Sequence, residues 1–381
     1  MSEARITARA AGLAALFLMP LGAAAVEEMD PAAFLSAYKS SVAGNASGCF
    51  VRLADEEVSR RFESLLEAVL AGDAAAADEE AEGLEAAGVR YRVVRLVGTA
   101  GPVLGFMEAV RPGDPDYRGW GAVLARPGPA GRVVYGAPHP KADLYSEEIA
   151  FQAFLANPLA LAAVLAGAHR NAVGDGDGDG APDSDAANDT ENLFHAVTRR
   201  LARRGLDRGE PLWFLQFHGA ADRDAEPSVV GSDGSGAPFI RPGSPLAAID
   251  SAVDDAGHIT MGVCGLREGE GDDEDGAYAL DASNNLQGAM LAALGQRHAF
   301  MHFEIERTAR DEWRAGAGPG HDGIAGLLEA IASILASTGP SAPPPLPARI
   351  SFQPAASEAP AGFLADTGSA FRFMDGPACG W

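Results

Sequence analysis

Apolar residues follow a helical period near the start of the chain and a strand-like pattern further on. The clearest helical run lies within residues 55–70, where one face carries Val58, Phe62, Leu65, Leu66 and Val69. A helix start is expected at Asp30-Pro31, and an Ala- and Glu-rich stretch continues to about residue 87. The pattern therefore predicts a mostly helical N-terminal region over 26–89.

From residue 90 onward, short β-forming runs alternate with amphipathic stretches. Strands are predicted at 91–97, 103–110, 120–125, 132–136, 159–167, 212–217, 259–264 and 300–306. Helices are predicted at 147–156 (with Ser146 as N-cap), 189–204, 244–254, 284–294 and 322–336. Loops are predicted at 111–115 and 127–131 (hairpins) and at 222–236 and 265–277 (polar, Gly/Asp-rich). The alternation predicts an α/β three-layer sandwich with a mostly parallel central sheet over 90–338.

The two ends of the chain differ in composition from the rest. Residues 1–25 combine Arg5 and Arg9 with a short apolar run and an Ala-rich end, which is the pattern of a cleaved signal peptide. The apolar run is too short for a comfortable membrane span. Residues 339–348 are Pro-rich and typical of an extended linker, and residues 349–381 form a separate C-terminal segment. The mature protein is therefore expected to be secreted or periplasmic, with no membrane span.

The net charge of the chain limits the classes of molecule that it is expected to bind. The 381-residue chain has a formal net charge of -24, which disfavours nucleic acid or an anionic membrane surface as the main partner. Asp and Gly alternate in the Asp175–Asp185 loop, which is the composition of a calcium loop, but the Glu of an EF-hand is missing at the twelfth position. The loop is either a calcium site or a solvated acidic insertion.

Histidines, carboxylates and an arginine gather where predicted strands end. His139 follows the strand at 132–136, and Asp143 and Glu147 follow His139 at the start of the next helix. Other strand ends carry His169-Arg170, His218, and Glu304 or Glu306. In open α/β sheets the active site lies at the carboxyl edge. Two histidines, one carboxylate and an open position make a hydrolytic zinc site, a further glutamate can serve as base, and an arginine can grip a substrate carboxylate.

Four short segments occur in an order that resembles zinc-carboxypeptidase-like amidohydrolases, in particular N-formylglutamate amidohydrolase-like proteins. They are Ala137-Pro138-His139-Pro140, Ala168-His169-Arg170-Asn171, Leu215-Gln216-Phe217-His218-Gly219 and His302-Phe303-Glu304-Ile305-Glu306-Arg307. The resemblance covers roughly residues 90–335 and implies the zinc-carboxypeptidase-like (phosphorylase/hydrolase-like) fold. It also implies zinc ligands at His139, Glu147 and His218, and a catalytic base at Glu304.

The chain departs from this family at one position that matters. The carboxypeptidase spacing His-x-x-Glu is absent, because position 142 is Ala. The carboxylate ligand is therefore Asp143 or Glu147. The run Glu-Ile-Glu-Arg resembles the family's Glu-Ile-Asn-Arg segment, which favours Glu304 over Glu306 as the base.

The leading hypothesis is an exported zinc-dependent hydrolase that cleaves an amide bond in a carboxylate-bearing substrate. Arg170 would orient that substrate, which would be a peptide, a cell-wall fragment or an N-acyl amino acid. The turn Pro138-His139-Pro140 also resembles the His-Pro-Asp-Asp motif of zinc N-acetyl-sugar deacetylases, although the two aspartates are missing. The alternative from another class is a non-catalytic secreted calcium- and glycan-binding protein. Residues 349–381 support that alternative, since they resemble the opening strands of a malectin-like β-sandwich but are too short to close one.

Overall fold

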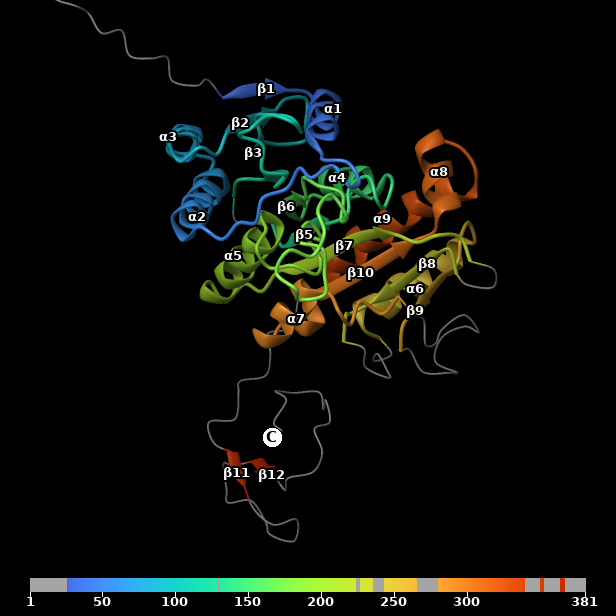
Figure 1. The fold of residues 1–381 in the computed structure, drawn as a ribbon. Coiled ribbons are helices and arrows are strands. Elements are labelled where there is room, and N and C mark those ends of the chain that lie inside the picture. The colour runs from blue at the N-terminus through green and yellow to red at the C-terminus, as the bar shows by residue number, and fades with distance from the viewer. Residues whose placement is uncertain are drawn as a thin grey trace, which may run out of the picture.

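A ten-stranded mixed sheet with the strand order β1-β2-β3-β4-β6-β5-β7-β10-β8-β9 organises the structure (Figure 1). The computed structural model describes residues 26–128, 131–223, 227–235, 243–265 and 280–339, and the backbone of 350–352 and 364–366. The predicted signal peptide at 1–25 lies outside the described residues, as do positions 340–348 of the linker and most of the C-terminal segment. Within that segment, two short strands, β11 (Ile350–Phe352) and β12 (Leu364–Asp366), pair in parallel.

The described elements follow the predicted alternation of helices and strands. The strands of the main sheet are β1 (Glu27–Met29), β2 (Tyr91–Leu96), β3 (Val103–Glu108), β4 (Ala122–Ala125), β5 (Val133–Ala137), β6 (Ala160–Leu165), β7 (Trp213–Gly219), β8 (Val229–Ser232), β9 (Met261–Val263) and β10 (Phe300–Ile305). The α-helices are α1 (Pro31–Ser41), α2 (Glu56–Ala71), α3 (Ala74–Ala86), α4 (Ser146–Ala156), α5 (Leu193–Asp207), α6 (Pro245–Ala256), α7 (Leu286–Ala293), α8 (Arg307–Ala315) and α9 (Pro319–Ser337).

The fold class is confirmed as α/β with a mixed, mostly parallel sheet. Among the described strands of the main sheet, five of the nine pairings are parallel and four are antiparallel. The parallel centre, β6-β5-β7-β10, has all four strands pointing the same way. Their carboxyl ends therefore meet at one edge, where an α/β fold places its active site.

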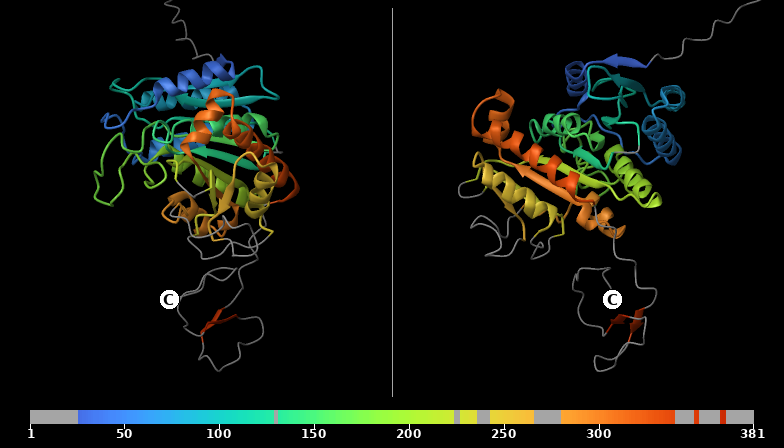
Figure 2. Two further views of the ribbon diagram at one scale, coloured as in Figure 1. Left: turned by 90° about the vertical axis from the view of Figure 1, so that its right-hand side faces the viewer. Right: turned by 180° about the vertical axis from the view of Figure 1, so that it is seen from behind.

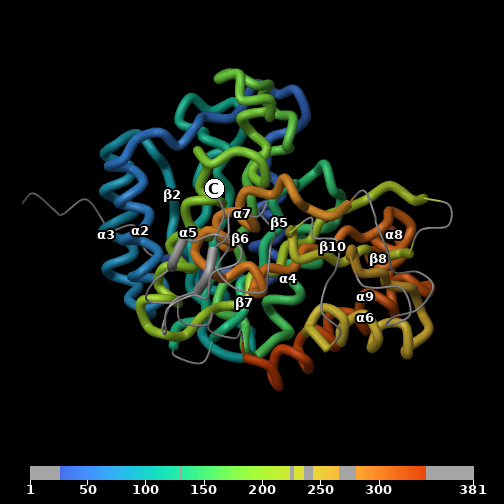
Figure 3. Tube along the Cα trace, turned by 90° about the horizontal axis from the view of Figure 1, so that it is seen from below, coloured from blue at the N-terminus to red at the C-terminus, as the bar shows by residue number. Residues whose placement is uncertain are grey.

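Helices cover both faces of the sheet, as a three-layer sandwich requires (Figure 2). One apolar core joins the sheet to α1, α4, α6, α8 and α9, and a second core joins the opposite face to α2, α3, α5 and α7. Seen from below, α2 and α3 lie toward the β2 end of the sheet, while α6, α8 and α9 lie toward the β8 end (Figure 3).

The N-terminal region packs onto the same sheet. Strand β1 pairs in parallel with β2, so the chain enters at the sheet edge. The side chains of Asp30, Asp55 and Asp73 cap the first three helices by accepting hydrogen bonds from backbone N–H groups in the first turn. The apolar face predicted for residues 55–70 is buried in the second core.

Three local predictions are wrong. The segment at 127–131 does not join a hairpin, because β6 lies between β4 and β5 in the sheet. The predicted loop at 222–236 contains β8, whose short Val229-Val230-Gly231-Ser232 run pairs antiparallel with β10. Ser146 is the first residue of α4 rather than its cap; Tyr145 takes the cap position in the left-handed conformation and makes no side-chain cap bond.

A buried carboxylate fixes the connection between β3 and β4. Glu108 is 2 % exposed and accepts hydrogen bonds from the backbone N–H groups of Arg118, Gly119 and Trp120. Burial raises the pKa of Glu108 to about 7, although these backbone hydrogen bonds act to lower it. The Glu108 carboxylate therefore binds three consecutive backbone N–H groups of the loop before β4.

Glu108→Ala is expected to destabilise the protein by about 2–4 kcal/mol, because it leaves buried N–H groups without partners. Urea unfolding measures this as a lower midpoint at an unchanged m-value. Glu85→Ala is the matched control, since the Glu85 side chain is 63 % exposed. Equal midpoints for the two variants would contradict the role assigned to Glu108.

Candidate metal centre

The candidate residues meet at the carboxyl edge of the three neighbouring strands β5, β7 and β10. His139 follows the last residue of β5 by two positions, and His218 lies near the end of β7. The parallel register places Glu304 of β10 directly opposite His218. The sheet thus brings together residues that are far apart in the sequence.

The turn after β5 folds Asp143 back onto His139. The backbone N–H of Asp143 bonds to the His139 carbonyl at 2.9 Å, and that of Ser146 bonds to the Asp143 carbonyl at 2.9 Å. Two residues in this turn that are not glycine have left-handed backbone conformations, Lys141 with φ 64° and Tyr145 with φ 74°. Such conformations cost energy and are concentrated at functional sites. Here they turn the carboxylate of Asp143 towards the imidazole of His139.

Three ligand atoms form a compact triangle. The Nδ1 atom of His139 lies 3.0 Å from Oδ2 of Asp143 and 3.2 Å from Nδ1 of His218, and the third side, from His218 to Asp143, is 3.4 Å. All three residues are buried. Ligands about 2.0–2.2 Å from a tetrahedral zinc ion lie about 3.3–3.6 Å apart. The donor set therefore suits a zinc ion, and the two shorter sides of the triangle, 3.0 and 3.2 Å, would lengthen by a few tenths of an ångström around one.

The opposite nitrogen of each imidazole has its own acceptor. His139 Nε2 lies 2.8 Å from Oδ1 of Asp185, and His218 Nε2 lies 3.3 Å from Oε1 of Gln216. Because both partners are acceptors, Nε2 carries the hydrogen in each ring. These contacts orient the rings so that both Nδ1 atoms face the carboxylate of Asp143, as the outer partners of metal-bound histidines do.

The charges at the triangle favour a cation. Burial would lower the pKa of His139, but hydrogen bonds and charge from Asp143 and Asp185 outweigh burial and raise it to about 9. Burial likewise opposes ionisation of the two carboxyl groups, yet the histidines hold the pKa of Asp143 well below its usual range, and His139 lowers that of Asp185 to about 2. Burial lowers the pKa of His218. Two ionised carboxylates that favour a proton on His139 would also favour a divalent ion at that point.

A second pair of polar side chains lies beside the triangle on β10. His302 Nε2 is 3.5 Å from Oε1 of Glu304, and the His302 ring lies 4.2 Å from that of His218. Burial, with charge from Asp143, raises the pKa of Glu304 to about 7. Burial also lowers the pKa of His302 well below its usual value. Glu306 leaves this face, since it is the N-cap residue of α8.

Glu147 and Arg170 lie around the triangle, and neither is a member of it. Glu147 is buried in the first turn of α4, with one carboxylate oxygen 3.7 Å from Lys39 Nζ. The sequence left Asp143 and Glu147 as alternative carboxylate ligands. In the structure, Asp143 is the one that contacts both His139 and His218. Arg170 is 42 % exposed in its side chain and pairs with Asp185 at 3.2 Å.

Three contributors to the site were not predicted: Asp185, Gln216 and His302. Asp185 ends the acidic loop and is buried with its carboxylate on His139, whereas residues 174–180 of that loop are exposed. Gln216 and His302 precede His218 and Glu304 by two residues and so share their face of the sheet. A polar residue two positions before a candidate site residue, inside an otherwise apolar strand, was the sequence feature that could have identified Gln216 and His302.

The rest of the acidic loop forms a separate, solvent-facing group. Oxygens of Asp175, Asp177 and Asp183 lie close enough together to hold a cation. Asp175 accepts hydrogen bonds from two glycine N–H groups of the loop, and Asp177 pairs with Arg52. These contacts explain how the loop folds without requiring an ion.

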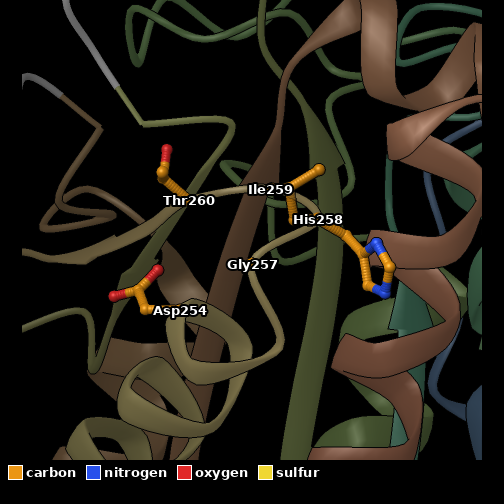
Figure 4. A pocket seen from close by; sticks show the side chains of 5 residues that line it. All are labelled: Asp254, Gly257, His258, Ile259 and Thr260. Atoms are coloured by element: carbon orange, nitrogen blue, oxygen red, sulfur yellow. The ribbon is translucent and has the colours of Figure 1, made fainter.

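A surface pocket also lies at the turn between α6 and β9. It is lined by Asp254, Gly257, His258, Ile259 and Thr260 (Figure 4). The His258 ring points away from the oxygens of Asp254 and Thr260. None of the triangle's residues lines this pocket, so the candidate chemistry belongs to the sheet edge.

The fold and site together define an α/β protein with a buried His-Asp-His cluster that could bind a metal. No family model matches the chain, and the search of curated proteins found no match. Among solved structures, a bacteriophage poly-gamma-glutamate hydrolase resembles it distantly, with a TM-score of 0.35 and 14% identity over 67% of this chain and 94% of that one. In the described part of the chain, no helix is both long and apolar enough to span a membrane.

Asp185→Asn is expected to lower the affinity for zinc by about 10–100-fold, because it weakens the acceptor that orients His139. Competition with a chromophoric chelator measures the change. Asp179→Asn is the matched control from the same loop, since Asp179 is exposed, its side chain accepts a hydrogen bond from the backbone N–H of Ala181, and it lies outside the groups of residues that could hold a metal ion. Equal affinities in the two variants would contradict the orienting role of Asp185.

Proposed function

We propose that the protein is a zinc-dependent hydrolase that cleaves an amide bond in a carboxylate-bearing substrate. The observation that supports this most strongly is the triangle of two imidazole nitrogens and one carboxylate oxygen, with sides of 3.0, 3.2 and 3.4 Å. Three protein ligands and an open fourth position are typical of catalytic rather than structural zinc. The ligands in this proposal are His139, Asp143 and His218, so Asp143 takes the position that the family resemblance gave to Glu147.

The residues beside the triangle supply the remaining chemistry. A bound ion would supply Lewis-acid activation of water and of the scissile carbonyl. Glu304, on the neighbouring strand, would accept a proton from the attacking water and deliver it to the leaving nitrogen. Its half-buried side chain, 13 % exposed, and its raised pKa suit it to exchange a proton near neutral pH.

Substrate choice in this proposal depends on Arg170. Its guanidinium is partly exposed next to Asp185 and offers a planar pair of donors that matches a carboxylate. An N-acyl amino acid, a peptide or a cell-wall fragment would meet that requirement. Export through the predicted signal peptide would place the enzyme outside the cytoplasm, where such substrates occur.

The proposal is tested by removing the metal with a chelator, restoring zinc, and assaying both forms on a panel of amides. The panel contains N-acyl amino acids, short peptides, cell-wall peptides and N-acetyl sugars. Zinc-restored hydrolysis of a carboxylate-bearing amide supports the proposal, and hydrolysis of N-acetyl sugars alone would instead favour a deacetylase. No hydrolysis together with a calcium-dependent gain in stability would favour the binding protein.

The acidic side of the pH profile provides a further prediction. Glu304 acts as a base only when ionised, so kcat/KM is expected to rise about tenfold per pH unit below its pKa and then level off. The midpoint is expected at or below about 7, because the pKa of Glu304 is raised to about 7 and a nearby cation would lower it. An acidic limb that remains unchanged in Glu304→Gln would contradict this role.

A further inference from the structure

Arg310 donates hydrogen bonds to the backbone at all three chain segments that carry the candidate site. Its Nε donates to the carbonyl of Ile305 at 2.9 Å, one terminal nitrogen donates to Leu144, and the other donates to Ala220 at 2.8 Å. Leu144 directly follows Asp143, Ala220 lies two residues after His218, and Ile305 directly follows Glu304.

The guanidinium is buried in the fold. Arg310 is 3 % exposed, and all the hydrogen bonds described for its side chain go to backbone carbonyl oxygens. Buried arginines are usually paired with carboxylates. A buried guanidinium whose described hydrogen bonds all go to backbone carbonyls is therefore unusual, and its role needs an explanation. A planar guanidinium presents donors on three separate nitrogens and so reaches three separate carbonyls at once, whereas a lysine has donors on one nitrogen alone.

Strand β7 leaves room for the Arg310 side chain at its last residue, Gly219. A Cβ atom at Gly219 would lie 2.6 Å from both terminal nitrogens of Arg310, closer than a carbon atom can approach. Gly219 is the last residue of β7 and directly follows His218. The absence of a side chain at this position therefore lets the guanidinium reach the carboxyl ends of the strands.

A second contact joins the loop after β7 to the start of α8. Asp222 accepts hydrogen bonds at 2.7 Å from both the backbone N–H and the hydroxyl of Thr308, in the first turn of α8. That contact fixes where α8 begins. Arg310, two residues after Thr308, then reaches back to the strand ends.

We propose that Arg310 is a positioning residue that sets the relative placement of the triangle and Glu304 through the carbonyls of Leu144, Ala220 and Ile305. This role rests on the metal-dependent function proposed above, and it is not a contact with substrate. Its positive charge also acts on Asp143 and Glu304. Loss of the guanidinium would therefore change the geometry of the metal ligands without removing any of them.

The test uses cobalt(II) alone as the probe, because its visible absorption reports the ligand geometry of a zinc site. Arg310→Lys retains the charge, but its single nitrogen cannot occupy the positions of the three guanidinium nitrogens. It is compared with Arg314→Lys, a matched change on the same helix at a side chain that is 57 % exposed. We expect Arg310→Lys to shift the cobalt absorption bands and to weaken cobalt binding about tenfold or more, and Arg314→Lys to leave both unchanged. A purely structural role would lower the unfolding temperature but leave the spectrum of the folded protein as in the wild type.

Gly219→Ala provides a second variant, because its new methyl group displaces the guanidinium while every donor remains. It is expected to change the cobalt spectrum in the same way as Arg310→Lys. Wild-type spectra and affinities in both variants would overturn the positioning role, and so would failure of both to fold, since Arg310 would then serve the fold alone. If the wild-type protein binds neither cobalt nor zinc, the proposed function fails and this proposal fails with it.

Discussion

His218→Ala is expected to lower zinc affinity by more than about 100-fold and to abolish measurable amide hydrolysis. Loss of an outer partner of a metal ligand costs about 10–100-fold, so loss of the ligand itself should cost more. His218 supplies one corner of the triangle, 3.2 Å from Nδ1 of His139 and 3.4 Å from Oδ2 of Asp143. Its removal would leave one nitrogen and one oxygen, too few for a stable zinc site.

The control for this experiment is His258→Ala. His258 is exposed at the turn between α6 and β9, away from the triangle. Both variants are titrated with zinc against a competing chelator and assayed on the substrate found in the amide panel. Retention of full zinc affinity by His218→Ala would show that the metal, if bound, lies elsewhere.

Glu304→Gln is expected to lower kcat by about 10²–10⁴-fold and to leave the zinc content near that of the wild type. The amide has almost the same shape as the carboxylate but cannot accept the proton. Glu304 is not one of the three triangle ligands, so metal binding should survive the change. The predicted combination, intact metal and lost rate, separates a catalytic base from a ligand.

Glu306→Gln is the control for Glu304→Gln, because the sequence alone left the two glutamates close in rank. Glu306 is the N-cap residue of α8 and makes no side-chain cap bond. Its replacement is expected to change the rate by less than about twofold, because Glu306 lies beyond the end of β10 and outside the groups that could hold a metal ion, so the change removes no proton acceptor of the site. A larger loss of rate in Glu306→Gln than in Glu304→Gln would show that Glu306, and not Glu304, is the base.

Periodicity in the sequence was enough to predict the class of the fold. Apolar runs with periods of two and 3.6 residues are local properties, and they located most of the helices and strands from residue 26 onward. The strand β8 was missed because only two valines mark it within a Gly/Asp-rich stretch. The order β4-β6-β5 could not be deduced, since the position of a strand in a sheet depends on contacts between distant parts of the chain.

The candidate site was predictable only as a set of strand-end residues. His139, His218 and Glu304 come together because parallel strands bring their carboxyl ends to one edge. The choice of Asp143 beside the histidines depends on two left-handed residues, Lys141 and Tyr145, that no periodic pattern reveals. Asp185 reaches His139 from 46 residues further along the chain, so that contact is a product of the tertiary fold.

The zinc site at His139, Asp143 and His218 is tested most directly by an anomalous-scattering map from zinc-loaded crystals, measured at the zinc absorption edge. We expect one strong peak between Nδ1 of His139, Nδ1 of His218 and Oδ2 of Asp143, about 2.0–2.2 Å from each. Zinc bound only at the exposed group of Asp175, Asp177 and Asp183, or no zinc peak at the carboxyl edge of the sheet, would contradict it.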